Sequence, residues 1–369
     1  MQLPMQFLFF PGGSYIGGME VVLQGLMAEL NEIGHRTLAV VSGWNNGDYP
    51  RRLEESGLAF EELKLGRFYR SKPLWTLDSL RNLPSAALKL RRLAREFRPQ
   101  AAVYPDPQLL LLGSLILPDL QSVLYQHTDV RGLASIPSIK LINGRMDRLV
   151  CVSEFVAATA QAAGFEPRKI TVVHNGIALP AADGCICRDR PITLGIVGRV
   201  GPQKQHAMLI KAIASVRRNQ PLVRFRLKII GTDNQPYAHE VRGLIKELKV
   251  QDIVEWSGFV ADRDDIYRAL DIVVAPAINE AFGMTVAEAA AYGLPVVAAR
   301  SGGFPELVVD GETGFLFDVG DLAQFTAALE RLIGDTSLRN RLGQAGRARA
   351  EKHFGTRDMA ERFVRALSA

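Results

Sequence analysis

Residues 272 to 308 read IVVAPAINEAFGMTVAEAAAYGLPVVAARSGGFPELV, and this stretch decides the fold. The runs 272–275 and 295–298 are short, apolar and rich in valine, which is typical of buried strands. Between them an alanine-rich stretch begins at Gly283 and has the composition of a helix. A strand, a helix and a second strand in this order predict neighbouring parallel strands of an α/β sheet.

The same alternation extends over both halves of the chain. Further strands are expected in the second half at 192–197, 226–230 and 253–256, and in the first half at 6–10, 36–42, 101–104, 122–126, 149–152 and 170–173, with helices at 19–32 and 154–163. Between the halves, 178–191 (ALPAADGCICRDRP) lacks periodicity and is typical of a linker. We therefore predict an α/β protein with two Rossmann-like, doubly wound parallel-sheet domains facing a central cleft. The domains are 1–178 and 190–354, and a C-terminal helix, 355–369, is expected to pack back on the first.

Length and composition fit two globular domains. The chain has 369 residues, 47% of them hydrophobic and 22% charged, and chains of this length usually divide into domains. No basic segment precedes the short apolar run at the N-terminus, so no signal peptide is expected. The apolar stretch 107–118 is shorter than the about 20 residues that span a bilayer. Cys151, Cys185 and Cys187 lack disulfide or zinc-site spacing, which favours a cytoplasmic protein. The net charge of +5 is too small to indicate a nucleic-acid partner.

A basic segment stands out from the otherwise even distribution of charge. Residues 61–98 contain ten Lys or Arg against four acids. Within it, four apolar residues recur at helical spacing among basic ones: Leu83, Leu90, Leu93 and Phe97. The pattern predicts a basic amphipathic helix over 79–98. Two interpretations stay open, an ordinary solvated helix face and a surface that docks on an anionic membrane leaflet.

Several loops at the predicted carboxyl edges of the first sheet carry glycine or polar residues. Gly12, Gly13, Gly17 and Gly18 precede a helix whose free N–H groups favour an anion, although a tight turn explains them equally. They lack the G-x-G-x-x-G spacing of a dinucleotide site, so no nicotinamide cofactor is expected. His127 and Asp129 follow the strand 122–126; a ligand contact and a buried structural histidine are both open.

In the second half, two loops combine cations with carboxylates. Arg199 and Lys204 lie on a glycine-bearing loop after the strand 192–197, where they could neutralise a diphosphate. Glu280 ends a loop, and Glu288 lies eight residues further on, inside the alanine-rich helix. The open N–H groups at the start of that helix suit an anion, and the carboxylates can accept hydrogen bonds from sugar hydroxyls. Together these residues favour a sugar-nucleotide site.

At these residues the chain resembles the retaining glycosyltransferases of family 4, which have the GT-B fold. It is similar to bacterial members that assemble lipopolysaccharide and exopolysaccharide. The most specific elements are the two glutamates separated by seven residues, with Phe282-Gly283 between them, and the following Gly302-Gly303-Phe304-Pro305-Glu306. The other elements follow in the family's order: Gly17-Gly18, His127, Asn175-Gly176-Ile177, and Arg199 with Lys204.

The resemblance implies a role for each matching residue. Arg199 and Lys204 would clamp the diphosphate, Glu280 and His127 would face the transferred sugar, and Glu288 would bind the nucleotide ribose. The implied donor-binding set is Gly17, Gly18, Phe282, Gly283, Met284, Thr285, Glu288, Gly258 and Val260, the last two near the base. Glu20 and Asp129 are candidates on the acceptor side.

The chain departs from the family pattern at two positions. Gln205 stands where glycine commonly follows the lysine, and His174 where proline commonly precedes Asn-Gly. Asp262-Arg263-Asp264 matches a metal-binding D-x-D, but the two acids also suit the first turn of a helix. Since Arg199 and Lys204 would neutralise the phosphates, we expect neither a metal nor another cofactor.

The expected activity is transfer of a hexosyl group, with retention, from a UDP- or GDP-linked sugar to a glycan, lipid-linked or lipopolysaccharide acceptor. The expected location is the cytoplasm, with contact at the inner face of the cytoplasmic membrane as an open alternative. Two other functions stay open on the same fold, a sugar-nucleotide epimerase and a non-catalytic partner subunit. Conversion of the donor without an acceptor would indicate the epimerase.

Overall fold

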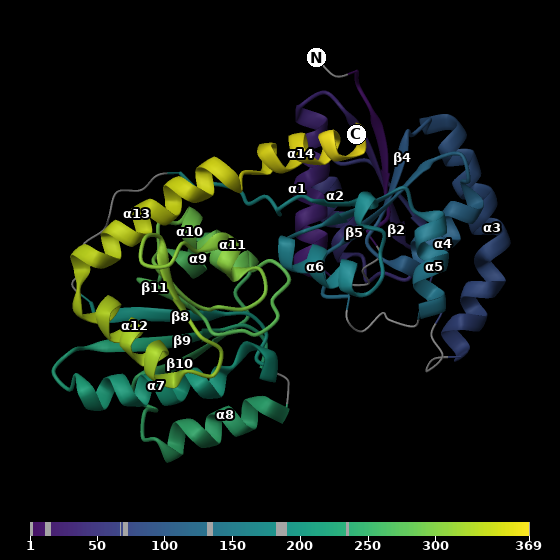
Figure 1. The fold of residues 1–369 in the computed structure, drawn as a ribbon. Coiled ribbons are helices and arrows are strands. Elements are labelled where there is room, and N and C mark those ends of the chain that lie inside the picture. The colour runs from purple at the N-terminus through teal and green to yellow at the C-terminus, as the bar shows by residue number, and fades with distance from the viewer. Residues whose placement is uncertain are drawn as a thin grey trace. The chain divides into compact units, whose positions relative to one another are not determined.

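The computed structural model describes residues 3–11, 16–66, 68, 73–130, 136–181, 190–233 and 236–368. The predicted linker residues Cys185 and Cys187 and the glycines Gly12 and Gly13 lie outside these ranges. The chain forms two compact units, one of Met1–Gly176 with Thr356–Ala369 and the other of Ile177–Gly355 (Figure 1).

The first unit is built on a sheet of seven parallel strands in the order β3-β2-β1-β4-β5-β6-β7. The strands are β1 (Gln6–Phe9), β2 (Arg36–Ser42), β3 (Phe60–Leu63), β4 (Ala101–Tyr104), β5 (Gln121–Gln126), β6 (Arg148–Cys151) and β7 (Ile170–Val172). The helices are α1 (Gly18–Glu32), α2 (Asp48–Glu55), α3 (Pro73–Phe97), α4 (Pro107–Ile116), α5 (Ile136–Arg145), α6 (Glu154–Ala162) and α14 (Thr356–Ser368), with a 3-10 turn at Pro167–Lys169. The central strands β1, β4, β5 and β6 are buried along most of their length because helices cover both faces of a parallel sheet.

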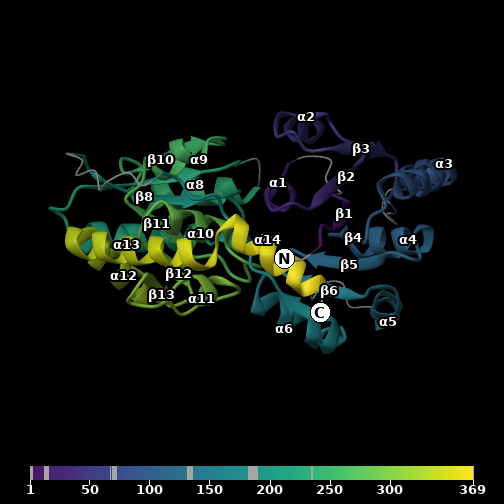
Figure 2. The ribbon, with the colours of Figure 1, turned by 90° about the horizontal axis from the view of Figure 1, so that it is seen from above.

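The last helix belongs to the first unit, because α14 lies against α1 (Figures 1 and 2). Its Phe363 is fully buried, with its ring centroid 5.9 Å from that of Phe7 and 6.1 Å from that of Phe9, both on β1. Tyr125 of β5 completes this aromatic cluster at 5.7 Å. The apolar face of α14 is therefore part of the core of the first unit.

The second unit repeats the plan with six parallel strands in the order β10-β9-β8-β11-β12-β13. The strands are β8 (Ile192–Val197), β9 (Phe225–Ile230), β10 (Val254–Gly258), β11 (Ile272–Ala275), β12 (Val296–Ala299) and β13 (Gly314–Phe317). The helices are α7 (His206–Asn219), α8 (Pro236–Glu247), α9 (Arg263–Tyr267), α10 (Met284–Ala291), α11 (Phe304–Leu307), α12 (Leu322–Gly334) and α13 (Thr336–His353), with a 3-10 turn at Pro202–Lys204.

These sheets confirm the predicted fold class of two doubly wound parallel sheets. Four predicted strands match the structure to the residue, and the others differ by one or two residues at an end. Two strands were not predicted, β3 and β13, and each lies at one edge of its sheet; the other two edge strands, β7 and β10, were predicted. β3 (FEEL) contains two acids and therefore lacks the apolar run of a central strand, whereas β13 (GFLF) has only three apolar residues after a glycine.

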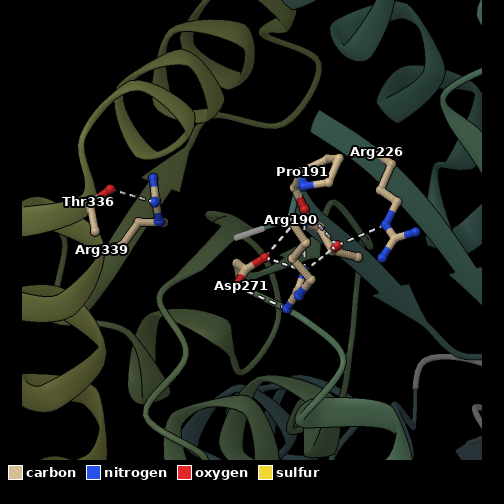
Figure 3. A network of polar contacts seen from close by, with 7 residues as sticks. Arg190, Pro191, Arg226, Asp271, Thr336 and Arg339 are labelled. Carbon is tan, nitrogen blue, oxygen red and sulfur yellow. Dashed lines mark hydrogen bonds and ion pairs between the residues drawn. The ribbon is translucent and has the colours of Figure 1, made fainter. Parts of the chain in front are cut away.

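A polar network fixes the amino edge of the second sheet (Figure 3). Asp271, just before β11, accepts hydrogen bonds from Arg190 (2.7 Å) and from the N–H of Thr193 on β8 (2.8 Å). Arg226 of β9 donates to the Thr193 hydroxyl at 3.0 Å. The starts of β8, β9 and β11 are thereby joined, and the opposite, carboxyl edge is left for the loops that carry the candidate site.

None of the helices in the described ranges is long and apolar enough to cross a membrane.

Candidate functional site

Two loops at the switch point of the second sheet carry the predicted phosphate-binding and sugar-binding residues. β8 pairs with β9 on one side and with β11 on the other, and open α/β sheets bind ligands beyond the carboxyl ends of the strands at such a point. The loop after β8 holds Arg199 and Lys204, and the loop after β11 holds Glu280. The structure therefore brings these three residues to one edge of the sheet.

Lys204 and Glu280 form an ion pair across this switch point. Lys204 Nζ lies 2.8 Å from Glu280 Oε2, and the side chains are 26% and 30% exposed. A ligand can therefore reach both charged groups. Arg199 is exposed and has no ion-pair partner within the described ranges. One carboxylate and two cations on one edge can bind a sugar hydroxyl and a diphosphate at the same time.

The backbone of the loop after β8 approaches its neighbours closely. A Cβ atom on Gly231, which follows β9 with φ +146°, would lie 2.1 Å from the carbonyl oxygen of Gly198. Gln205, one of the two departures from the family pattern, has φ +55°, a conformation that glycine adopts without strain. Gln205 therefore differs in its side chain from the glycine that is common at this position, while its backbone has a conformation that suits glycine.

The loop that presents Glu280 is held by backbone contacts to the Ser301-Gly302-Gly303 segment. The N–H of Gly303 donates to the carbonyl of Glu280 at 2.9 Å, and Asn279 N–H donates to Ser301 Oγ at 3.0 Å. Gly302 has φ +60°, and a Cβ atom there would lie 2.1 Å from the Glu280 carbonyl oxygen. The two glycines after β12 thus allow the close approach that fixes the Glu280 backbone.

The start of α10 offers free N–H groups beside this loop. Gly283 is the N-cap, with φ +104°, and accepts from the N–H groups of Val286 and Ala287. The N–H groups of Met284 and Thr285 have no acceptor among the described residues, and the positive end of the helix dipole is at this end of α10. Phe282, by contrast, is buried, with its ring 6.0 Å from that of Phe354. Its side chain therefore packs in the protein and offers no group to a ligand.

Glu288 is held by two side chains of α9. Arg263 Nε lies 3.0 Å from Glu288 Oε1, and the Tyr267 hydroxyl donates to Oε2 at 2.6 Å. Only 12% of the Glu288 side chain is exposed. Burial raises the pKa of this carboxyl, while the Arg263 charge and the Tyr267 hydrogen bond act in the opposite direction. The carboxylate is thus oriented within the first two turns of α10.

The D-x-D sequence caps a helix. Asp262 is the N-cap of α9, and its carboxylate accepts from the N–H of Asp264 at 2.8 Å. Asp264 accepts from the Tyr292 hydroxyl and pairs with Arg268 at 3.1 Å. This arrangement agrees with the helix-cap interpretation. Within the described ranges no three His, Cys, Asp or Glu side chains are grouped as metal ligands.

The predicted base-side residues lie at the carboxyl end of β10, where Gly258 is the last residue of the strand and Val260 follows it. Gly258 has φ +68° and accepts from the N–H of Gly231 at 2.7 Å, which links the loops after β9 and β10. Val260 is half-buried, and Phe259 between them is 73% exposed. An exposed phenylalanine at the carboxyl edge is a suitable surface for a planar ring.

In the first unit, the Glu20 side chain caps the N-terminus of α1. Gly17 is the N-cap, and its N–H donates to Glu20 Oε2 at 2.9 Å. Glu20 is buried, which raises its pKa, and its backbone carbonyl accepts from the Tyr49 hydroxyl. Its carboxylate therefore turns back on the helix start. Gly18 has open space where a Cβ would be.

His127 lies directly after β5, as predicted. Its ring centroid is 4.3 Å from that of Tyr125, and its Nε2 is buried without a hydrogen-bond partner in the described part of the chain. Burial lowers the pKa of His127 to about 3, so the ring is neutral. Gln126 holds the turn by donating to the Thr128 carbonyl at 2.9 Å, and Asp129 is half-buried in the same turn.

Sequence reasoning missed the residues that hold the site together. Arg263 and Tyr267 are four residues apart and therefore lie on one face of α9, a signal that could have paired them with an acid on a neighbouring helix. Gly302 was part of the quoted pattern, but only the structure shows that it touches the Glu280 carbonyl.

Models of two protein families match the chain, one mainly in each unit. The model of "Glycosyltransferase Family 4" matches residues 16–179, and that of "Glycosyl transferases group 1" matches residues 187–349. The second match contains both glutamates and both cations of the switch-point site.

Similar proteins are known by sequence and by structure. The D-inositol 3-phosphate glycosyltransferase of Corynebacterium efficiens is 37% identical over 198 residues, which are 48% of this chain and 46% of that protein. The chain thus matches about half the length of such relatives. The chain aligns with the crystal structure of Anabaena HepE in complex with UDP and glucose over 99% of each chain, with a TM-score of 0.81 and 22% identity. The lipopolysaccharide outer core galactosyltransferase WaaB also covers 99% of both chains, with a TM-score of 0.75 and 17% identity. At these identities the structures show the shared fold.

Proposed function

Since the chain belongs to the family 4 glycosyltransferases, we propose that it transfers a hexosyl group from a nucleotide-diphosphate sugar to a hydroxyl acceptor, with retention at the anomeric carbon. The observation that carries the proposal is the Lys204–Glu280 ion pair at the switch point of the second sheet. In this pair, a cation that suits a phosphate and a carboxylate that suits sugar hydroxyls lie 2.8 Å apart, near the start of α10 with its free N–H groups.

Each residue of the site has a task in this reaction. Arg199 and Lys204 neutralise the diphosphate as it leaves, and the N–H groups of Met284 and Thr285 bind phosphate or sugar oxygens. When the donor binds, Lys204 exchanges part of its contact with Glu280 for a phosphate oxygen, which frees the carboxylate for a sugar hydroxyl. Glu288, oriented by Arg263 and Tyr267, accepts from the ribose hydroxyls.

The donor and the acceptor are proposed by chemical class. A UDP-linked hexose is the first choice, because the structurally similar Anabaena HepE was crystallised with UDP-glucose; GDP-linked sugars are the second. For the acceptor we propose a glycan, a lipid-linked glycan or lipopolysaccharide, used at the inner face of the cytoplasmic membrane. The name shared by the sequence relatives favours an inositol phosphate as a further acceptor to test.

Calorimetry with UDP, GDP and their hexose derivatives, without added metal, tests the donor site. We expect one nucleotide family to bind, Glu288→Ala to weaken its binding at least about tenfold, and the exposed Glu312→Ala to bind as the wild type. Absence of binding to every nucleotide would contradict the proposal and favour a non-catalytic subunit.

A second assay tests transfer itself. Chromatography would follow release of the nucleoside diphosphate with and without acceptors of the three classes and with inositol phosphate. Lys204→Met should lower kcat about 100-fold or more, because a positioned cation stabilises the leaving phosphate, whereas Lys211→Met on the exposed face of α7 should not. Conversion of the donor sugar without any acceptor would instead indicate an epimerase.

A further inference from the structure

Helix α3 carries a row of leucines on the face that points away from its own unit. Leu74, Leu77, Leu80 and Leu88 are 78%, 64%, 52% and 68% exposed. They are three, three and eight residues apart, so they lie along one side of the helix, with the exposed Pro84 between them. Scattered exposed leucines are normal on a protein surface, but four in a row on one helix form a patch.

This row is a different face from the one that the sequence pattern predicts. Leu90 is fully buried, and Leu83, Leu93 and Phe97 are half-buried. That side of α3 packs on β3 and α4, at the edge of the first unit (Figures 1 and 2). The predicted apolar face therefore belongs to the core, and the helix has a second apolar row on its outside.

The outer face continues into a cluster of basic residues. Arg81 lies among the leucines and Arg95 lies beyond them, and both are exposed and have no ion-pair partner in the described part of the chain. Arg91 and Arg92 are also exposed; the first donates to the Ile116 carbonyl and the second pairs with Glu96. The only other acid of the helix, Asp78, accepts from the indole of Trp44. The outer face therefore combines leucines with a net positive charge.

From this combination we propose that the outer face of α3 is a membrane-docking surface that lies in the interface of an anionic bilayer. Leucine side chains enter the acyl boundary, and the arginines bind lipid phosphates while their stems cover apolar surface. Charge complementarity favours an anionic membrane as the partner, because each basic residue near a negatively charged leaflet increases the membrane affinity by up to about tenfold. A second protein copy would bring arginines against arginines on the same face.

Co-sedimentation of the full chain with lipid vesicles tests the proposal. The vesicles contain either equal parts of phosphatidylcholine and phosphatidylglycerol or phosphatidylcholine alone. We expect binding to the anionic vesicles only, reduced strongly at 1 M salt, where the Debye length is about 3 Å. Arg81→Gln with Arg95→Gln should weaken the partition coefficient about 30-fold, and Leu77→Ser with Leu80→Ser should weaken it at least about tenfold.

Matched variants control for general surface effects. Arg218→Gln with Arg341→Gln removes two exposed arginines of the second unit, and Leu179→Ser with Leu222→Ser removes two exposed leucines there. Both pairs should bind vesicles as the wild type. All variants should keep the wild-type thermal transition, which checks the fold, and wild-type nucleotide binding, which checks the proposed function. Vesicle binding requires no donor, so it can fail or succeed independently of the proposed function.

Three outcomes would overturn the proposal. These are equal binding to both kinds of vesicle, no binding to either, or a control pair that loses binding as much as the α3 variants. A wild-type dimer in light scattering that becomes a monomer in the leucine variant, together with absent vesicle binding, would assign the face to a second copy of the chain.

Discussion

At the scale of single residues, the orientation of the Glu288 carboxylate depends on a tyrosine. Tyr267 donates the 2.6 Å hydrogen bond to Glu288 and stacks on Tyr292, with ring centroids 5.0 Å apart. Tyr267→Phe keeps the ring and removes only the donor. We expect nucleotide affinity to fall about tenfold or more, because one hydrogen bond to a charged group contributes about 1.5–3 kcal/mol. Calorimetry with the bound nucleotide measures this loss.

The pH dependence distinguishes orientation of the carboxylate from general damage. The Tyr267 hydrogen bond lowers the pKa of Glu288, so its removal raises that pKa further. Binding that needs the carboxylate should therefore be lost at a higher pH in the variant as the solution is acidified. Tyr292→Phe is the matched control, since this hydroxyl bonds Asp264 and not Glu288. An equal effect of both variants would contradict the positioning role.

These residues show what a sequence can predict about a site. Lys204 and Glu280 were proposed from loops that lie 76 residues apart, and the parallel topology alone brings them to one edge. Arg263 and Tyr267 could not be found in this way, because their partner is chosen by the packing of α9 on α10. Glu20, a candidate on the acceptor side, accepts a hydrogen bond from the N–H of Gly17, a contact that the sequence analysis did not predict.

At the scale of elements, the turn after β12 supports the loop after β11. Gly302 has φ +60° and no room for a Cβ, which would lie 2.1 Å from the Glu280 carbonyl oxygen. Gly302→Ala should therefore lower the free energy of unfolding by about 3 kcal/mol or more, the sum of left-handed strain and a backbone clash. Transfer activity should also fall, because the loop that carries Glu280 must move. Chemical denaturation and the transfer assay measure the two effects.

Gly311→Ala is the control that separates the two contributions to the Gly302→Ala effect, left-handed backbone strain and steric clash with the Glu280 carbonyl. Gly311 has φ +78° but open space where a Cβ would be. Its replacement should cost only the left-handed strain, about 1–2 kcal/mol, and leave activity unchanged. If both variants behaved alike, the contact with the Glu280 carbonyl would have no importance.

A second element-scale prediction concerns the network at the amino edge of the second sheet. Asp271 joins Arg190 to the Thr193 N–H, and the Arg190 and Asp271 side chains are only 20% and 27% exposed. Asp271→Ala removes the charge partner of Arg190 and the side-chain acceptor of the Thr193 N–H. We expect a loss of about 2 kcal/mol, which lowers the Tm by about 4–8 °C. Asp252→Ala breaks the exposed Arg217–Asp252 pair and should change the Tm by about 2 °C or less. Differential scanning calorimetry compares the two.

At the scale of the whole molecule, the alternation of strands and helices was sufficient to predict two doubly wound sheets. Central strands can be predicted from the sequence, because burial on both faces favours apolar runs such as Ile272–Ala275. Two of the four edge strands, β3 and β13, and the outer leucines of α3 were not predicted. An edge or an outward face is set by what packs against it, and the local residue pattern does not contain that information.

The second unit contains a buried neutral histidine, His206, which gives a test of acid stability. His206, at the start of α7, has no hydrogen-bond partner for either ring nitrogen among the described residues. Burial and the nearby Lys204 charge lower its pKa from 6.5 to about 4. The unfolded chain therefore binds a proton between these values that the folded unit does not, so stability is complete above pH 6.5 and is lost as the pH falls toward 4.

Fluorescence of single tryptophans can follow the second unit within the full chain. Trp256 is the only tryptophan of that unit, so Trp44→Phe with Trp75→Phe leaves its signal alone. Between pH 7 and pH 5 we expect a loss of about 2 kcal/mol from His206. His206→Leu removes the titrating group and should abolish that part of the loss, whereas replacement of the exposed His239 by leucine should not. An unchanged pH dependence in His206→Leu would show that the folded unit tolerates the charged ring, and acid sensitivity of the second unit would then have another origin.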